Sequence, residues 1–218
     1  MREEFIALKI QLALDRMEIT EAMELTKKVE ESIDWIEVGT SLIKEFGMAS
    51  VKKLKQFFPH KTIVADIKTI DNARYEFEMA FNAGADVATV MAVSPLVTIE
   101  ACMDVANKYE KTVMIDLLNS SEEQVKELLK YKEAIFCMHV SKDEQEASGV
   151  TLQRKTYSGL LSGQELQLAV AGGITIDSLE NIRRSLNPGV IIIGSAITRA
   201  NDPAKTAAQM KLATLKEE

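Results

Sequence analysis

Hydrophobic residues in this chain gather in short runs that alternate with longer stretches of mixed polarity. Eight of these runs have the length and the Val, Ile, Leu and Ala content of buried β-strands. They are Lys9 to Leu14, Asp34 to Val38, Thr62 to Ala65, Asp86 to Met91, Thr112 to Ile115, Ala134 to Met138, Gln167 to Ala171 and Val190 to Ile193.

Most of the stretches between these runs repeat apolar residues at helical spacing. They predict helices over Thr20 to Glu30, Leu42 to Phe57, Ala73 to Ala83, Pro95 to Tyr109, Glu122 to Lys130, Ser178 to Ser185 and Pro203 to Leu215. From Asp143 to Glu165 glycines interrupt the pattern, which indicates a loop followed by a short helix.

Regular alternation of strand and helix indicates parallel strands joined by crossover helices. Eight such units predict an α/β fold, a single-domain (β/α)8 TIM barrel. The barrel would span residues 1–218, with residues 1–8 as a short N-terminal extension. An open doubly wound sheet is the alternative. That fold would be expected to carry a glycine fingerprint after its first strand, and Leu14 to Met17 contains no glycine.

Composition narrows the range of partners. The chain has 218 residues and a net charge of −7, which argues against nucleic acid because phosphate backbones need clustered Lys and Arg. The longest apolar runs, such as Val190 to Ile193, are too short to span a bilayer, and the first residues lack the apolar core of a secretory signal. Cys102 and Cys137 have no metal-ligand spacing. We therefore expect a reduced, cytoplasmic protein with no membrane partner.

Six charged or titratable side chains stand where the predicted strands end. In a TIM barrel the carboxyl ends of the strands form the catalytic mouth. A solvated loop charge is the ordinary interpretation of any one of these residues, but six at corresponding positions favour a shared site. They are Asp15, Glu37, Asp66, Lys68, Asp116 and His139.

The predicted mouth is strongly acidic, and carboxylates that face one cavity repel one another unless a cation neutralises them. Oxygen ligands and waters suit Mg2+, and Glu37 and Asp66 on adjacent strands are the predicted ligands. An ion-pair network centred on Lys68, without a metal, is the alternative. His139 suits proton transfer at neutral pH, unless it is a hydrogen-bonded core residue, whereas His60 would lie at the opposite end of the barrel.

Glycine turns follow the last two predicted strands, at Gly172-Gly173 and at Gly194-Ser195. Glycine lets backbone N–H groups approach a ligand closely, and these two loops are the usual phosphate site of TIM barrels. We expect these four residues to bind a substrate phosphate. Arg199 is close enough in sequence to contribute to phosphate binding. The alternative is that its side chain points to solvent.

Several of these positions belong to longer motifs: Asp66-x-Lys68-x-x-Asp71, Leu14-Asp15, Ile36-Glu37-Val38-Gly39, Ala171-Gly172-Gly173 and Gly194-Ser195. Together they resemble the orotidine 5′-monophosphate decarboxylase suprafamily. Within it, the chain is most similar to the group of 3-hexulose-6-phosphate synthases and 3-keto-L-gulonate-6-phosphate decarboxylases. The resemblance covers the chain from Lys9 to about Lys211.

The resemblance implies a Mg2+-dependent enzyme that acts on a phosphorylated sugar through an enediolate. It implies that Glu37 and Asp66 hold Mg2+. Lys68 would stabilise the enediolate oxygens, and His139 would move the proton at the reacting carbon.

The same resemblance implies further binding residues and a dimer. Asp15 would bind substrate hydroxyls, and Asp116 would belong to the substrate site. Asp71 would act catalytically by reaching into the neighbouring subunit's active site, which implies a homodimer with shared sites.

Three positions bear on the choice between the two chemistries. Asp116 resembles the synthases, because the decarboxylases carry glutamate there. Lys142 and Ser195 stand where the decarboxylases have arginine. The resemblance therefore implies 3-hexulose-6-phosphate synthase activity, the Mg2+-dependent addition of formaldehyde to D-ribulose 5-phosphate and its reverse.

Other functions remain open. A 3-keto-L-gulonate-6-phosphate decarboxylase is the first alternative. A non-catalytic barrel that binds sugar phosphates is less favoured, because the Asp66, Lys68, Asp71 and His139 set is intact. A pentose-phosphate epimerase would need two histidines at a metal, and only His139 is predicted at the mouth.

Overall fold

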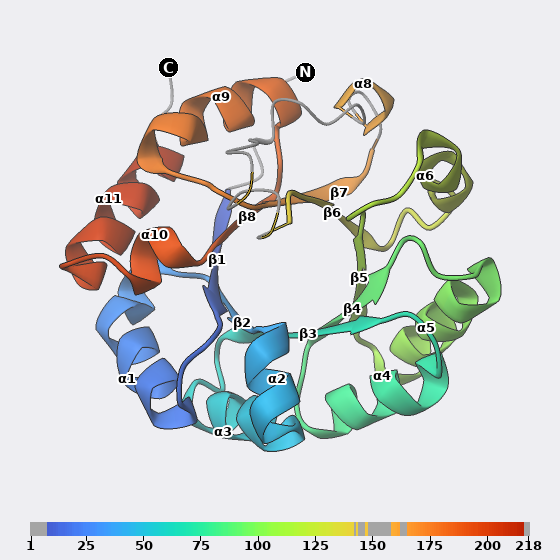
Figure 1. Cartoon of the computed structure of the whole chain (residues 1–218), viewed down its shortest axis with the longest axis horizontal. Helices are drawn as coiled ribbons and strands as arrows, with labels where there is room; N and C mark the ends of the chain where they lie inside the picture. Colours follow the sequence, from blue (N-terminus) through green and yellow to red (C-terminus); the bar gives the residue numbers. More distant parts are fainter. Residues whose placement is uncertain (1–7, 142, 144–146, 148–157, 162–164, 216–218) are drawn as a thin grey trace.

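The computed structural model describes residues 8–141, 143, 147, 158–161 and 165–215. Eight parallel strands close into a barrel in the order β1 to β8, and helices surround it (Figure 1). The strands are β1 Lys9–Leu14, β2 Trp35–Val38, β3 Thr62–Thr69, β4 Val87–Met91, β5 Thr112–Asp116, β6 Ile135–His139, β7 Gln167–Ala171 and β8 Val190–Ile193. This confirms the predicted (β/α)8 TIM barrel.

The helices lie outside the barrel and follow the sequence prediction closely. They are α1 Ile19–Val29, the 3-10 helix η1 Glu30–Ser32, α2 Thr40–Phe46, α3 Met48–Phe57, α4 Ala73–Asn82, α5 Leu96–Tyr109, α6 Glu122–Leu128, α8 Ser158–Leu161, α9 Ile176–Leu186, α10 Ser195–Thr198 and α11 Pro203–Leu215. The short α8 lies in the segment predicted to be a loop and a short helix. Within the described part of the chain, every helix is too short or too polar to span a bilayer.

One predicted helix is two helices in the structure. The pattern over Leu42 to Phe57 predicts a single helix, but α2 ends at Phe46 and α3 begins at Met48. Gly47 between them has a φ of 60°, a conformation that glycine adopts without the steric cost of a side chain. A backbone turn at one glycine therefore overrides a continuous apolar pattern.

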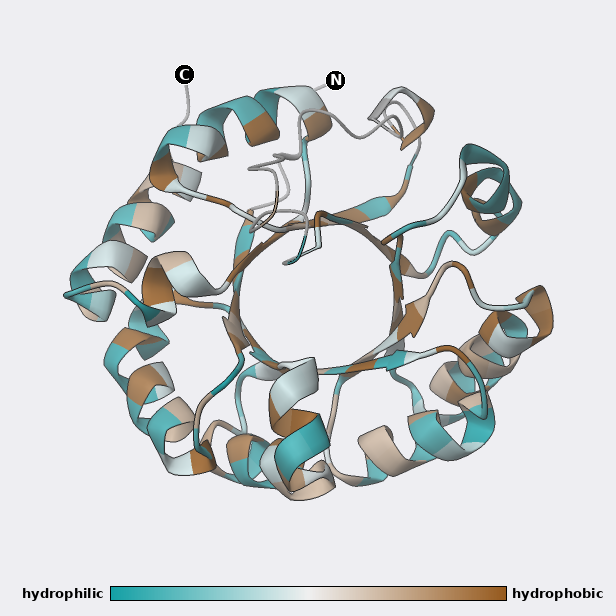
Figure 2. Cartoon of the chain, in the orientation of Figure 1, coloured by the Kyte–Doolittle hydropathy of each residue, from teal (hydrophilic) through white to brown (hydrophobic). Residues whose placement is uncertain are grey.

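Side chains of the strands alternate between the barrel interior and the layer beneath the helices. On β3, Ile63 and Ala65 belong to the outer core, whereas Val64 packs inside the barrel with Met114 and Ile135. Figure 2 shows hydrophobic colours along much of the strand ring and hydrophilic stretches on outlying helices such as α6. The inward rows matter for function because they lead to the mouth.

Strand β3 is longer than predicted. The sequence prediction ended it at Ala65, but it continues to Thr69. Ala65 lies opposite Ala88 of β4, and Thr69 lies opposite Val90. Three residues of β3, 66–68, therefore face Thr89 alone, which is a β-bulge. The prediction was wrong here because polar residues were expected only after the strand.

Ion pairs tie the amino ends of the strands. The carboxylate of Asp86 lies 2.7 Å from the ammonium groups of both Lys55 and Lys111. Burial opposes the charged form, but the two lysines outweigh it and lower the pKa of Asp86. Nε2 of His60 lies 2.9 Å from Oε1 of Glu30, and His60 does not line the cavity at the carboxyl ends of the strands. In a TIM barrel, residues at the amino ends of the strands contribute to stability, and the active site lies at the carboxyl ends.

Candidate active site

The polar side chains at the mouth continue the inward rows of the strands. Because side chains in a strand alternate with a period of two, each polar residue lies two positions beyond an inward-facing one. The pairs are Trp35 and Glu37, Val64 and Asp66, Met114 and Asp116, and Cys137 and His139. The four polar side chains therefore converge on a cavity of about 770 Å³ at the carboxyl ends of the strands.

Nearly all of the predicted site residues line this cavity. They are Asp15, Glu37, Asp66, Lys68, Asp116, His139, Gly172, Gly173, Gly194 and Ser195. Asp71 is the exception. It is exposed after β3 and accepts a hydrogen bond from the backbone N–H of Asn72 at 2.7 Å. Its place in a neighbouring subunit's site stays a prediction.

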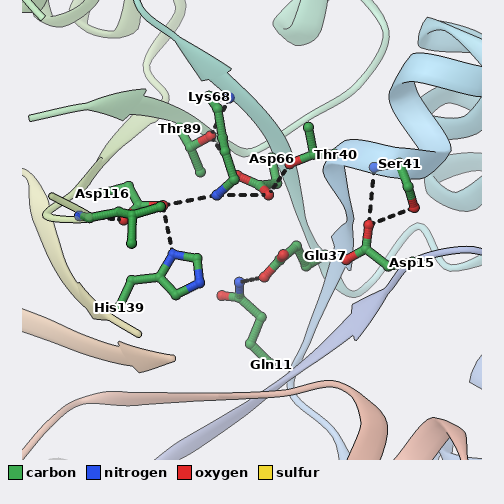
Figure 3. Close-up of polar contacts among 11 residues, drawn as sticks. Gln11, Asp15, Glu37, Thr40, Ser41, Asp66, Lys68, Thr89, Asp116 and His139 are labelled. Atoms are coloured by element: carbon green, nitrogen blue, oxygen red, sulfur yellow. Dashed lines mark hydrogen bonds and ion pairs between the residues drawn. The ribbon is translucent and has the colours of Figure 1, made fainter. Parts of the chain in front are cut away.

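A row of contacts joins four of these side chains (Figure 3). The Nζ of Lys68 lies 3.2 Å from Oδ2 of Asp66 and 2.9 Å from Oδ2 of Asp116. The same oxygen of Asp116 lies 2.9 Å from Nδ1 of His139. Asp116 therefore connects the ammonium group to the imidazole, although the two residues lie on β3 and β6.

Charges in this row keep both lysine and aspartate ionised. Burial opposes the charged form of Lys68, but Asp66 and Asp116 outweigh it and raise the pKa of Lys68 above its ordinary value. Burial likewise opposes the charged form of Asp116. Hydrogen bonds and charge from His139 and Lys68 outweigh it and lower the pKa of Asp116 far below its ordinary value. Lys68 therefore lies at the centre of an ion-pair network with Asp66 and Asp116. The choice between this network alone and a bound Mg2+ stays a prediction.

The ionised state of Asp116 fixes the tautomer of His139. An ionised carboxylate can only accept hydrogen bonds, so Nδ1 of His139 must carry the hydrogen in the 2.9 Å contact. In a neutral imidazole the other nitrogen, Nε2, then holds the basic lone pair. The second oxygen of Asp116 accepts from the backbone N–H of Leu118 at 2.9 Å, which fixes the carboxylate in turn.

Glu37 and Gln11 form a second polar cluster, which together with Asp66 we call the floor of the cavity. Glu37 is only 8% exposed, and the Nε2 of Gln11 donates a hydrogen bond to its Oε2 at 2.5 Å. Burial, and then the charge of Asp66, raise the pKa of Glu37 to about 8. The amide oxygen of the same Gln11 side chain, Oε1, is buried and has no hydrogen-bond partner within the part of the chain that the structure describes. The floor therefore has a surplus of acceptors and of negative potential.

This donor set fits the predicted Mg2+. Within the described residues no cluster of three or more His, Cys, Asp or Glu groups could hold a metal. Two carboxylates remain, Glu37 and Asp66, and Mg2+ in proteins is commonly held by one or two carboxylates with waters and substrate oxygens. Burial and the charge of Asp66 together raise the pKa of Glu37, and Oε1 of Gln11 lacks a partner among the described residues. A bound cation with its waters would relieve both.

Asp15 occupies a separate position at the mouth. Its Oδ1 accepts hydrogen bonds from the backbone N–H of Ser41 at 3.0 Å and from the Ser41 hydroxyl at 2.7 Å. A β-carbon on Gly39 would overlap the Asp15 carboxylate, so only glycine leaves room for it. Asp15 thus links the end of β1 to the first turn of α2.

The loops after β7 and β8 form the remaining wall. Gly172 and Gly173 have φ values of 103° and 65°, which residues with a side chain rarely adopt. Three exposed cations, Arg16, Lys44 and Arg199, line the same cavity. No ion pair to any of the three occurs among the residues that the structure describes. We call these three cations the basic rim, so that the cavity combines an acidic floor with a basic rim.

Sequence reasoning missed several of these residues. Gln11 and Thr89 are polar residues at inward positions of apolar strand runs, and that position was the available signal. Arg16 and Lys44 gave no signal, because isolated cations usually mark a solvated surface. Lys142, which entered the choice between the two chemistries, lies outside the described residues.

The fold and the site define the class of protein. A TIM barrel with a lysine, carboxylates and a histidine gathered at its carboxyl mouth has the arrangement of an enzyme active site. The sequence profile described as the Orotidine 5′-phosphate decarboxylase / HUMPS family matches residues 8–210. The chain belongs to this family.

Particular relatives narrow the class. The 3-hexulose-6-phosphate synthase of Bacillus subtilis (strain 168) is 35% identical over 206 residues, which cover 94% of this chain and 97% of the relative. The crystal structure of 3-hexulose-6-phosphate synthase from Salmonella typhimurium superposes with a TM-score of 0.89 at 34% identity, over 95% of this chain and 98% of that chain. A 3-keto-L-gulonate-6-phosphate decarboxylase from Vibrio cholerae gives a TM-score of 0.85 at 30% identity, over 95% and 97%. This chain is an enzyme with lyase activity.

Proposed function

We propose that this enzyme is a 3-hexulose-6-phosphate synthase. It would join formaldehyde to D-ribulose 5-phosphate through an enediolate, with Mg2+ as cofactor, and would catalyse the reverse cleavage. The observation that carries the proposal is the row from Asp66 through Lys68 and Asp116 to His139, on a chain whose full-length relatives include named synthases.

Proton transfer is the first requirement of this reaction. A base must take the proton from C1 of ribulose 5-phosphate, and the electron pair of that C–H bond then forms the enediolate. Nε2 of His139 is suited to this step because Asp116 holds the hydrogen on Nδ1. After C1 bonds to the carbon of formaldehyde, the imidazolium can return the proton to the new alkoxide oxygen.

Charge stabilisation is the second requirement. The raised pKa of Lys68 keeps its ammonium group charged, and it already lies between two carboxylates at the cavity wall. We assign Lys68 to the enediolate oxygens, where negative charge develops. Bound Mg2+, held by Glu37 and Asp66, would supply further positive charge at the substrate oxygens.

The rim is suited to the other end of the substrate. Arg16, Lys44 and Arg199 are exposed, line the cavity and are free of ion pairs among the described residues. Together with the glycine turn at Gly172 and Gly173, they favour a phosphate at this wall. Asp15 would accept hydrogen bonds from substrate hydroxyls between rim and floor.

We further propose a homodimer with shared active sites. Asp71 is exposed and does not line the cavity of its own chain. Exposed apolar side chains lie near it in the sequence, Ile70 with 56% and Tyr75 with 65% exposure. If a second subunit covers these side chains, Asp71 of the first subunit would lie at the cavity of the second.

The test is a direct assay. The purified protein is incubated with ribulose 5-phosphate, formaldehyde and Mg2+, and hexulose 6-phosphate is quantified, with EDTA and with Lys68→Met as controls. Product that depends on Mg2+ and disappears in Lys68→Met is the expected result. A folded protein that forms no product would sink the proposal. Release of CO2 from 3-keto-L-gulonate 6-phosphate faster than aldol addition would establish the decarboxylase instead.

A further inference from the structure

The bulge in β3 places Thr89 beside two functional residues at once. Between Ala65 and Thr69, residues 66–68 of β3 face the single residue Thr89 of β4. We propose that Thr89 is a positioning residue that holds both Asp66 and Lys68 in their working geometry. The inference rests on the roles given to Asp66 and Lys68 in the proposed function.

Lys68 has a backbone conformation that needs external support. Its φ is 46°, in the left-handed region, where the β-carbon of an L-residue is crowded by its own backbone. Left-handed conformations of residues with long side chains persist where the surrounding structure holds them, and they concentrate at functional sites. The bulge turns this backbone so that the ammonium group lies at Asp66 and Asp116.

One hydroxyl supplies this support. The backbone N–H of Lys68 donates to Oγ1 of Thr89 at 2.9 Å, and the Thr89 hydroxyl donates to Oδ1 of Asp66 at 2.9 Å (Figure 3). The two bonds are compatible because a hydroxyl has one donor and two acceptor positions. Thr89 is only 4% exposed, so water does not readily replace either bond.

The second bond orients the Asp66 carboxylate. With Oδ1 turned to Thr89, Oδ2 receives the hydroxyl of Thr40 at 2.5 Å and faces Nζ of Lys68 at 3.2 Å. The carboxylate is thus held from two sides, by α2 through Thr40 and by β4 through Thr89. Loss of the Thr89 hydroxyl would free both the carboxylate and the strained backbone beside it.

Two variants separate this role from simple packing. Thr89→Val keeps the shape and removes the hydroxyl, whereas Thr89→Ser keeps the hydroxyl and removes a methyl group. Thr26→Val is the matched control, because Thr26 is a fully buried threonine of α1 whose hydroxyl donates to the carbonyl oxygen of Ala22. It tests what the loss of a buried hydroxyl does away from the cavity.

Two readouts are needed, and one of them does not depend on turnover. Hydrogen exchange of the Lys68 amide, followed by NMR, should be about tenfold or more faster in Thr89→Val than in wild type or Thr89→Ser. In the aldol assay, kcat of Thr89→Val should fall about 10- to 100-fold while KM changes less than about threefold. Thr89→Ser should retain most of kcat, and Thr26→Val should lose thermal stability without losing kcat.

Several results would overturn the proposal. One is a folded Thr89→Val with wild-type kcat or unchanged exchange, and another is a Thr89→Ser as impaired as Thr89→Val. If Thr89→Val does not fold, the wild-type protein decides, since rapid exchange of its Lys68 amide would contradict the hydrogen bond on which the role depends. A wild-type protein without synthase activity would refute the proposed function alone, because the exchange measurement still reports the hold of Thr89 on Lys68.

Discussion

Replacement of Glu37 by glutamine should stabilise the metal-free protein. Glu37 is buried, its neighbour Asp66 is negative, and the two together hold its pKa at about 8 instead of 4.5. Glutamine has the same shape and no charge. It can keep the hydrogen bond from Gln11 and can donate to the unpartnered Oε1 of Gln11.

The magnitude follows from the two pKa values. A raised pKa in the folded state means that this residue's contribution to stability is fully present below pH 4.5 and is lost as the pH rises through about 8. At pH 7 the loss is on the order of 3 kcal/mol, because the folded protein must take up a proton that the unfolded chain does not hold. Glu37→Gln removes this loss, which corresponds to an increase in Tm of about 6–12 °C for a domain of this size.

The assay is thermal and urea unfolding in EDTA at pH 5, 7 and 8, at a fixed protein concentration because a dimer's stability depends on it. The gain of Glu37→Gln over wild type should be small at pH 5 and should grow toward pH 8. Glu24→Gln on the exposed face of α1 is the control, with an expected change within about 0.5 kcal/mol at every pH. Mg2+ should raise the Tm of wild type and leave that of Glu37→Gln unchanged.

Three outcomes would refute parts of this reasoning. A variant that is less stable than wild type at pH 8 would show that Glu37 is not a buried, repelled carboxyl. An equal gain at pH 5 and pH 8 would show that the effect comes from packing and not from the charge. A Mg2+ response that persists in Glu37→Gln would remove Glu37 from the proposed cation site.

Three further predictions concern turnover. Asp116→Asn should lower kcat about 10²- to 10⁴-fold with little change in KM. An amide can donate to Nδ1 of His139 and so favour the tautomer whose hydrogen is on Nε2. A kcat equal to that of wild type across the pH range would contradict this reasoning. Arg199→Gln should raise the KM for ribulose 5-phosphate about fivefold or more and weaken the salt dependence of this KM. Lys28→Gln on α1 is the control and should change neither. A KM of Arg199→Gln equal to that of wild type would exclude Arg199 from phosphate binding. Inactive Lys68→Met and inactive Asp71→Asn, dissociated and mixed in equal amounts, should recover about a quarter of wild-type activity, since half of the dimers are hybrid and each has one intact site. No recovery in hybrids verified by mass spectrometry would argue against shared sites.

The overall fold was predictable because it depends on local periodicity. Eight apolar runs separated by amphipathic stretches specify parallel strands and covering helices, and all eight strands formed where these runs lie. The polar mouth was predictable for the same reason, since Glu37, Asp66, Asp116 and His139 each stand at the end of such a run. The boundaries failed where the backbone departs from the regular pattern, at Gly47 and in the bulge of β3.

The sequence by itself determined the barrel and gathered the acidic floor, Lys68 and His139 at one end of it. Only the tertiary structure decided how these groups pair, because their partners lie far apart in the chain. Asp116 meets Lys68 across 48 residues, and Gln11 meets Glu37 across 26. The register of β3 against β4 sets Thr89 opposite the bulge, and a register of this kind is fixed by hydrogen bonds between strands and not by any local pattern. Apolar spacing thus indicates which residues reach the mouth, whereas the closed sheet determines which of them touch.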